Sequence, residues 1–225
     1  MSLPEVVLHL STEVLADLND DESLAFAFAH GPAVAEFGQG AELLCVWDLP
    51  EAPSELNGVA SHITVGQFHS HLDELYAGRG WYEPGTTALT LAAQFSHGTL
   101  LADDSELGSE ARGRITDFPD KLIEASAQLL QENAEALAKT LIEMPNDPWH
   151  RAHLLDVGLH RAYVAFFAAS EEFFPGIAHR ADWVRLLGLD EGVLEAERGI
   201  WASLEDPGAL SGAWRCFAER VLKTV

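Results

Sequence analysis

The sequence predicts an α+β protein, with a mixed α/β domain over residues 1–114 followed by a C-terminal helical bundle over residues 115–225. Three observations support this fold class. The first hundred residues alternate short apolar runs with Gly and Pro, which is typical of short strands and helices. After Pro119, apolar residues recur at helical spacing over long stretches. The chain has 225 residues, of which 48% are hydrophobic, so it can bury a core in one large domain or in two small ones.

In the first half, short apolar runs bounded by turn-forming residues define the expected elements. A turn through Asn19-Asp20-Asp21 separates the first helix from the first strand, and Pro50 and Pro53 indicate a loop after the second strand. In order, we expect a helix near 12–18, strands at 24–29, 42–47 and 62–65, helices at 67–76 and 86–96, a short apolar run at 100–102, and a polar loop at 103–113.

In the second half, long amphipathic patterns predict a bundle of helices joined by short loops. Pro119 suits the first turn of a helix, with Asp117 just before it as a candidate cap. Pro145 and Pro148 end this long helix. A second long helix is expected at 149–173, ending before Pro175-Gly176, and shorter helices are expected at 181–187, 191–204 and 208–225.

The composition narrows the functional classes. The formal net charge is −23, which repels phosphate backbones and anionic lipid, so we expect neither nucleic-acid nor membrane partners. The two cysteines, Cys45 and Cys216, form neither a disulfide framework nor a metal-binding pattern, and Cys45 lies inside an apolar run that predicts burial. The N-terminus lacks a signal-peptide pattern, and no apolar run approaches the ~20 residues that span a bilayer. We therefore expect a cytoplasmic protein.

Residues 26–48 form a pattern that can be compared with the motifs of known protein families. The pattern is an apolar run, a glycine, a short segment of small residues, and a second apolar run. The pattern resembles the polymerase-beta-like nucleotidyltransferase superfamily, especially small bacterial aminoglycoside and lincosamide nucleotidyltransferases. The resemblance implies an α/β domain followed by a helical bundle. The family motif is an apolar strand, Gly-Ser, a short helix, and a strand carrying Asp-x-Asp. The matching pieces are Phe26 to His30, Gly31-Pro32, Ala33 to Glu36, and Ala41 to Trp47.

The acidic residues of that motif are replaced in this chain. Nucleotidyl transfer needs divalent metal ions, which prefer carboxylate oxygens held on a rigid strand. The resemblance aligns Ala41 and Leu43 with the two aspartates, while Glu42 between them points to the opposite face. The strand near 61–65, where the resemblance implies a third carboxylate, has no acid. Pro32 replaces the serine that helps to hold a phosphate, and it lacks a backbone N–H. The motif is therefore interpreted as degenerate, with no metal site.

A second copy of the Gly-Ser signature occurs downstream. Residues 108–113 spell Gly-Ser-Glu-Ala-Arg-Gly, close to the pattern of active members. The segment follows the acidic stretch 103–106 and no apolar strand, so we expect a surface loop there.

The leading hypothesis is a nucleotidyltransferase-like protein without metal-dependent transfer. It binds a nucleotide or a small polar ligand in a cleft between its two domains. The candidate ligand-binding residues are Gly31, Pro32, Glu171 and Glu172. The last two are equally well explained as a solvated helix end.

Two alternatives remain open. The chain could be an active enzyme, with magnesium and a nucleotide as cofactors, that uses shifted acids; Glu42 and Asp48 are then the catalytic candidates, with the acids of 103–106. It could also be a non-enzymatic interaction module, such as an antitoxin-like partner.

Three histidines share a helical spacing. His150, His153 and His160 lie three and seven residues apart on the second long helix, which places them roughly on one face. The spacing allows a metal site with help from another helix, or a polar stripe facing solvent or the other domain.

Overall fold

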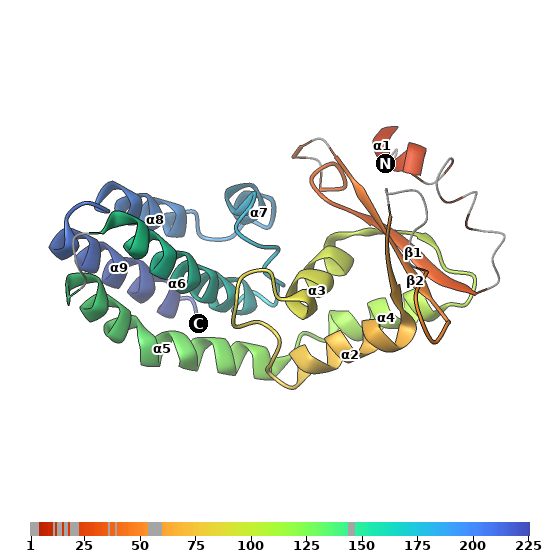
Figure 1. Ribbon diagram of the computed structural model, residues 1–225, viewed down its shortest axis with the longest axis horizontal. Helices are drawn as coiled ribbons and strands as arrows, with labels where there is room; N and C mark the ends of the chain where they lie inside the picture. The colour runs from red at the N-terminus through yellow and green to blue at the C-terminus, as the bar shows by residue number, and fades with distance from the viewer. Residues whose placement is uncertain are drawn as a thin grey trace. The chain divides into compact units, whose positions relative to one another are not determined.

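The computed structural model describes residues 5–10, 12, 15, 18, 23–35, 37–38, 40–53, 60–143 and 147–225. Part of the helix expected near 12–18 lies outside these residues. The chain divides into two compact units, described here one at a time. Unit 1 contains residues 1–74 and 91–118, and unit 2 contains residues 75–90 and 119–225. The described part has an α+β fold, with a mixed sheet in unit 1 and helices through most of the rest, as the sequence predicts (Figure 1).

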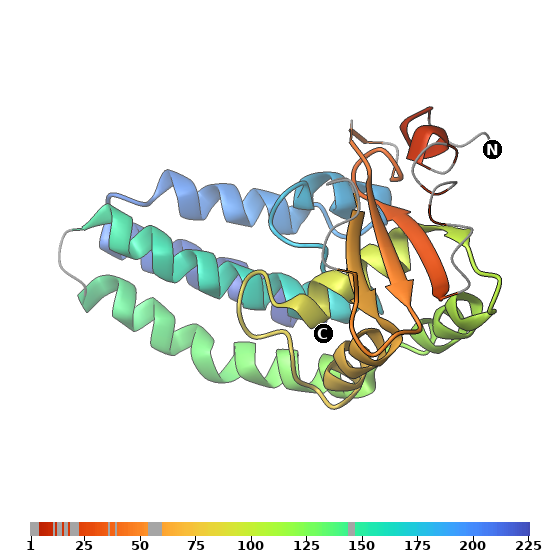
Figure 2. The same ribbon diagram turned by 45° about the vertical axis from the view of Figure 1, so that its right-hand side comes forward.

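Unit 1 is built on a four-stranded mixed sheet, seen with β1 and β2 side by side in Figure 2. The strands β1 (Leu24–His30), β2 (Glu42–Trp47), β3 (Ala60–Thr64) and β4 (Thr99–Ala102) lie in the order β3-β2-β1-β4. Strand β1 is antiparallel to β2 and to β4, and β2 is parallel to β3. In this register His30 lies opposite Glu42, and Ala29 lies opposite Leu43.

The two faces of this sheet are both apolar, because β1 and β2 bury nearly every side chain. On one face Phe26 and Phe28 pack against Phe68 and Phe95, with ring centroids 4.9 to 5.7 Å apart. These two partners come from α2 (Val65–Tyr76) and α3 (Thr87–His97). On the other face lies a cluster that we call the apolar cluster. Its buried members are Val7, Leu10, Leu15, Leu18, Ala27, Ala29, Leu43, Cys45 and Trp47.

Val7 in the apolar cluster belongs to α1 (Glu5–His9). Cys45 is fully buried, as predicted, and burial raises the pKa of its thiol to about 12. The thiol is therefore protonated at neutral pH and behaves as a small apolar group.

Gly98 lies between α3 and β4, where two backbone carbonyl oxygens leave no room for a side chain. A Cβ on this residue would lie 2.6 Å from the Gln94 carbonyl oxygen and 2.8 Å from that of Ala29. We expect Gly98→Ala to lower the free energy of unfolding by about 2 kcal/mol, because neither backbone oxygen can move without disturbing its own element. Urea denaturation followed by circular dichroism measures this.

Gly113 provides the matched control, since it lies on a helix of the same unit and a Cβ there would meet nothing within 4 Å. Gly113→Ala should be neutral or stabilising by up to about 1 kcal/mol, as expected for Ala over Gly in a helix. Equal changes in the free energy of unfolding for Gly98→Ala and Gly113→Ala would contradict the close backbone packing at Gly98.

Unit 2 is a bundle of helices (Figure 1). Its elements are α5 (Asp120–Glu143), α6 (Pro148–Ala168), α7 (Arg180–Leu186), α8 (Gly192–Ala202) and α9 (Pro207–Leu222). Helix α9 packs against α5, α6 and α8. Two of these helices begin with the same Asp-Pro pair, in which the aspartate carboxylate caps the first backbone amides and proline takes the first helical position.

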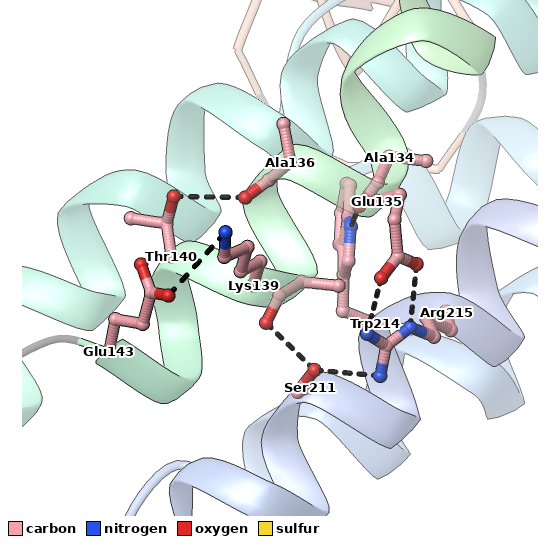
Figure 3. Close-up of polar contacts among 10 residues, drawn as sticks. Ala134, Glu135, Ala136, Lys139, Thr140, Glu143, Ser211, Trp214 and Arg215 are labelled. Atoms are coloured by element: carbon pink, nitrogen blue, oxygen red, sulfur yellow. Dashed lines mark hydrogen bonds and ion pairs between the residues drawn. The ribbon is translucent and has the colours of Figure 1, made fainter.

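Polar side chains of α9 tie it to α5 (Figure 3). Trp214 donates from Nε1 to the Ala134 carbonyl at 2.8 Å, and Ser211 donates to the Ala138 carbonyl at 2.8 Å. Arg215 makes a bidentate pair with Glu135, with N–O distances of 2.8 and 2.6 Å. The indole and the hydroxyl are thus buried with their hydrogen bonds satisfied, as a stable core requires.

Helix α6 is shorter than the expected 149–173. It ends at Ala168, and Glu171 then adopts a left-handed conformation with φ of 58°. The turn brings Phe174 back onto α6, where its ring stacks on Tyr163 with centroids 5.5 Å apart. The prediction was wrong here because continuing the helix would have carried this buried aromatic residue away from the core.

The described helices include none with the length and apolarity needed to cross a lipid bilayer.

Candidate functional site

The turn after β1, where the resemblance places a phosphate-holding Gly-Ser, closes on itself. Gly31 has φ of 108°, and a Cβ there would lie 3.2 Å from the Gly40 carbonyl oxygen, so glycine suits this position. The Ala33 amide donates to Gly40 at 3.0 Å, and the Val34 amide donates to Gly31 at 3.1 Å. These two amides after Pro32 are therefore used within the loop and do not point together toward an anion.

The two positions aligned with the family's aspartates face the apolar cluster. Leu43 is fully buried inside it, and Ala41 packs against it from the start of β2. Ala60, the partner of Leu43 on β3, packs against the same cluster. At these three places the chain presents methyl and isobutyl groups, which cannot ligate a metal.

Glu42 lies on the opposite face of β2, beside His30. Its Oε2 is 4.0 Å from His30 Nε2, and its side chain is largely exposed. Burial lowers the pKa of His30, and the Glu42 carboxylate offsets only part of that effect. His30 is therefore mainly neutral at pH 7, and the pair is a histidine with an adjacent carboxylate rather than a full ion pair.

Asp48, the other catalytic candidate, lies beyond the far end of β2, where its amide donates to the Ser23 carbonyl at 2.9 Å. Six residues along an extended strand correspond to about 20 Å, so Glu42 and Asp48 cannot share one metal ion. Strand β3 brings no acid to this region, and its His62 accepts a hydrogen bond from Trp47 Nε1 at 3.0 Å. Within the described ranges, no three His, Cys, Asp or Glu side chains gather closely enough to hold a metal ion.

The downstream Gly-Ser copy forms a helix, so the expectation of a surface loop at 108–113 is wrong. It lies in α4 (Leu107–Thr116), with Gly108 and Ala111 buried. The Asp103 carboxylate accepts hydrogen bonds from the amides of Gly108 and Ser109, both at 2.7 Å, and from the Ser109 hydroxyl at 2.6 Å. An acid that the sequence presents as loop thus caps the first turn and stabilises the helix.

Glu171 and Glu172 follow the end of α6 in unit 2. Glu171 is exposed, and its amide donates to the Ala168 carbonyl at 2.9 Å. Glu172 is half-buried, and this burial raises the pKa of its carboxyl group.

The three histidines of α6 have different surroundings. His150 and His153 are exposed, whereas His160 is buried and its Nε2 lies 2.9 Å from the Trp81 carbonyl oxygen. That nitrogen must be protonated to donate to the carbonyl, so it is not available to a metal. Burial lowers the pKa of His160 despite the hydrogen bond. His160 therefore anchors the 77–86 loop within unit 2, next to Arg161, which donates to the Tyr82 carbonyl.

The most developed polar site in unit 2 centres on Glu197 of α8, which the sequence analysis did not single out. Its carboxylate accepts hydrogen bonds from Tyr163 Oη at 2.6 Å, Arg180 Nε at 2.8 Å and Trp201 Nε1 at 2.7 Å. A second Arg180 nitrogen, Nη2, also pairs with it. Arg180 in turn donates to the Ile177 carbonyl and lies over the Tyr163 ring.

The electrostatics of this network follow from burial and pairing. Burial by itself would raise the pKa of Glu197, but the hydrogen bonds from Arg180, Tyr163 and Trp201 outweigh it and lower the pKa. Burial, together with the carboxylate, raises the pKa of Tyr163, so the hydroxyl stays protonated as the donor. One sequence signal could have pointed to the site. Glu197 occupies an apolar helical stripe formed by Val193, Leu194, Ile200 and Trp201.

A surface pocket of about 250 Å³ lies over this network. It is lined by residues from the start of α7 and from α8, and all of its lining comes from unit 2. The lining residues are His179, Arg180, Ala181, Leu194, Glu197, Arg198 and Trp201.

No protein-family model matches the chain, and no curated protein matches it. Among solved structures, the chain is similar to a nucleotidyltransferase-like protein from Exiguobacterium sibiricum 255-15. The TM-score is 0.48 and the identity is 11%, over 96% of this chain and 74% of the other. At this level of similarity no property of that protein is transferred to this chain.

Proposed function

We propose that this chain is a nucleotidyltransferase-like protein that has no metal-dependent nucleotidyl transfer and acts by binding a nucleotide or a small polar ligand. The observation that carries the first part is the burial of Leu43 in the apolar cluster, with Ala41 packed beside it. These are the two places where the motif that the chain resembles requires carboxylates.

The coordination chemistry of magnesium supports the proposal that the chain has no metal-dependent nucleotidyl transfer. Magnesium binds oxygen ligands in a near-octahedral arrangement and uses at least one or two carboxylates in phosphoryl-transfer sites. Glu42 and Asp48 lie at opposite ends of β2, so neither provides the second carboxylate for the other. The amides after Gly31 donate within their own loop, which also argues against a phosphate cradle there.

A transfer assay tests the catalytic part. The purified chain is incubated with radiolabelled ATP or GTP, with magnesium or manganese, and with a panel of aminoglycoside and lincosamide acceptors. We expect no labelled acceptor above background, while an active aminoglycoside nucleotidyltransferase in the same assay modifies its substrate. Metal-dependent labelling that disappears in Glu42→Ala or Asp48→Ala would refute the proposal and favour an active enzyme with shifted acids.

Calorimetric titration tests the binding part. Mononucleotides and small polar ligands are titrated into the chain with magnesium and, separately, with EDTA. Binding is expected to be independent of the metal, because the proposal includes no metal site. Absence of heat for every compound at millimolar concentration would overturn this part and leave the prediction on transfer standing.

A further inference from the structure

We propose that the pocket between α7 and α8 binds a small ligand that combines a flat aromatic ring with an anionic group. The inference deepens the proposed binding function and rests on it. The pocket volume of about 250 Å³ lies below the range of ~300–1,000 Å³ typical of drug-sized ligands, so the ligand is small. A nucleoside monophosphate and an aromatic carboxylate share this chemistry.

The floor of the pocket is held rigid before any ligand arrives. Glu197 is buried, and its two oxygens hold Arg180, Tyr163 and Trp201 in place. The Arg180 guanidinium compensates the charge of Glu197, so the carboxylate does not repel an anion as an isolated charge would. A site whose side chains are already fixed loses less conformational entropy on binding.

The pocket offers a platform for a ring. Trp201 lines it and is 41% exposed, while its Nε1 is bound to Glu197, which fixes the orientation of the indole. Leu194 and Ala181 add an apolar wall. Aromatic rings stack on such a partly exposed, oriented indole, and each stacked base contributes a measurable share of binding.

The pocket also offers a guanidinium group for an anion. Arg198 lines it with a side chain that is 67% exposed and that forms an ion pair with Glu195, at 2.9 Å and one helical turn away. Such exposed pairs are weak, so a ligand anion can compete for the guanidinium. His179 lines the same pocket at the start of α7. Arginine suits both phosphate and carboxylate because its planar fork can donate two parallel hydrogen bonds.

Titration calorimetry on the full chain tests the assignment with four probes. AMP and indole-3-acetate carry both a ring and an anion, adenosine lacks the anion, and inorganic phosphate lacks the ring. At least one of AMP and indole-3-acetate should bind, and at least about tenfold more tightly than adenosine and phosphate. Adenosine loses the charge-assisted hydrogen bond, and phosphate loses the stacking on the indole. The preferred probe distinguishes a nucleotide site from an aromatic-acid site.

Variants locate the binding. Arg198→Ala and Trp201→Ala should each weaken it by about tenfold or more. Arg185→Ala is the control, because Arg185 is a half-exposed arginine on α7, the other helix beside the pocket, and does not line the pocket. It should change affinity less than about twofold, and thermal unfolding of each variant confirms that it is folded.

Three results would overturn the inference: no binding of either ring-bearing anion, equal binding of adenosine or phosphate, or equal effects of the Arg198 and Arg185 substitutions. If a nucleotide binds with unchanged affinity in Arg198→Ala and Trp201→Ala, the pocket assignment fails while the proposed binding function stands. The outcome of the nucleotidyl-transfer assay affects neither the test of ligand binding nor the assignment of binding to this pocket.

Discussion

Leu43→Asp is expected to unfold unit 1 rather than restore a metal site. The side chain at position 43 has no exposed surface and lies among aliphatic and aromatic neighbours of the apolar cluster. Truncating a buried leucine already costs about 2–5 kcal/mol, and an ionised carboxylate in the same place adds an uncompensated charge. We expect a loss of more than about 4 kcal/mol, which is a large fraction of the stability of an ordinary domain. Urea denaturation and circular dichroism measure the loss.

Leu49→Asp serves as the control for the same chemical change. Leu49 follows β2 and is 37% exposed, so its carboxylate stays hydrated and the cost should remain within about 1 kcal/mol. The argument about the apolar cluster would be refuted by a Leu43→Asp variant that keeps wild-type stability and binds magnesium in a calorimetric titration.

Glu197→Ala is expected to lower the free energy of unfolding by about 3 kcal/mol. The substitution leaves the Arg180 guanidinium and the Tyr163 hydroxyl without their carboxylate partner in a largely buried place. Removing one member of a buried, hydrogen-bonded pair is costly because the other charge remains uncompensated. Chemical denaturation measures the change.

Glu195→Ala, on the exposed side of the same helix and with a side chain 74% exposed, should change stability by less than about 0.5 kcal/mol. Similar losses in both variants would contradict the role of Glu197.

The same carboxylate should make unit 2 sensitive to acid. The pKa of Glu197 is lower in the folded chain than its ordinary value of 4.5, so the folded state binds this proton less readily than the unfolded state. The stabilisation is therefore fully present above pH 4.5 and is lost as the pH falls through the folded pKa. The stability difference between the wild type and Glu197→Gln should be largest near neutral pH and should narrow below pH 4.5. A difference independent of pH would show that the carboxylate charge is not what stabilises the site.

Local pattern accounts for most of the elements that the sequence predicted. Strands β1 and β2 were predicted within one residue at their ends because each is a run of apolar residues bounded by turn formers. The start of α6 was predicted within one residue, but Pro148, which we expected to end the preceding helix, is the first residue of α6, and the Asp147 carboxylate caps its first turn. Local pattern failed for α4, where the deciding contact is the Asp103 carboxylate, four residues before the helix begins.

Contacts distant in sequence decided the candidate site. Glu197 meets Tyr163 and Arg180 across 34 and 17 residues, and periodicity alone cannot tell which acid on a helix will find such partners. His160 was grouped with two exposed histidines by its spacing, but its hydrogen bond to Trp81, 79 residues earlier, separates it from them. The spacing of residues along a helix indicates which of them share a face. Whether that face is buried depends on the elements that pack against it.

By itself, the sequence determined the α+β class, the helical character of the second half, and the absence of carboxylates at positions 41 and 43. These are properties of residue type and local period, which do not depend on distant neighbours. Only the tertiary structure decided that Leu43 is sealed in an apolar cluster, that α6 stops at Ala168, and that a buried carboxylate organises a pocket beside Trp201. Each of these depends on contacts between segments far apart in the chain, because burial and ion pairing are set by the packing of whole elements and not by the order of residues within one.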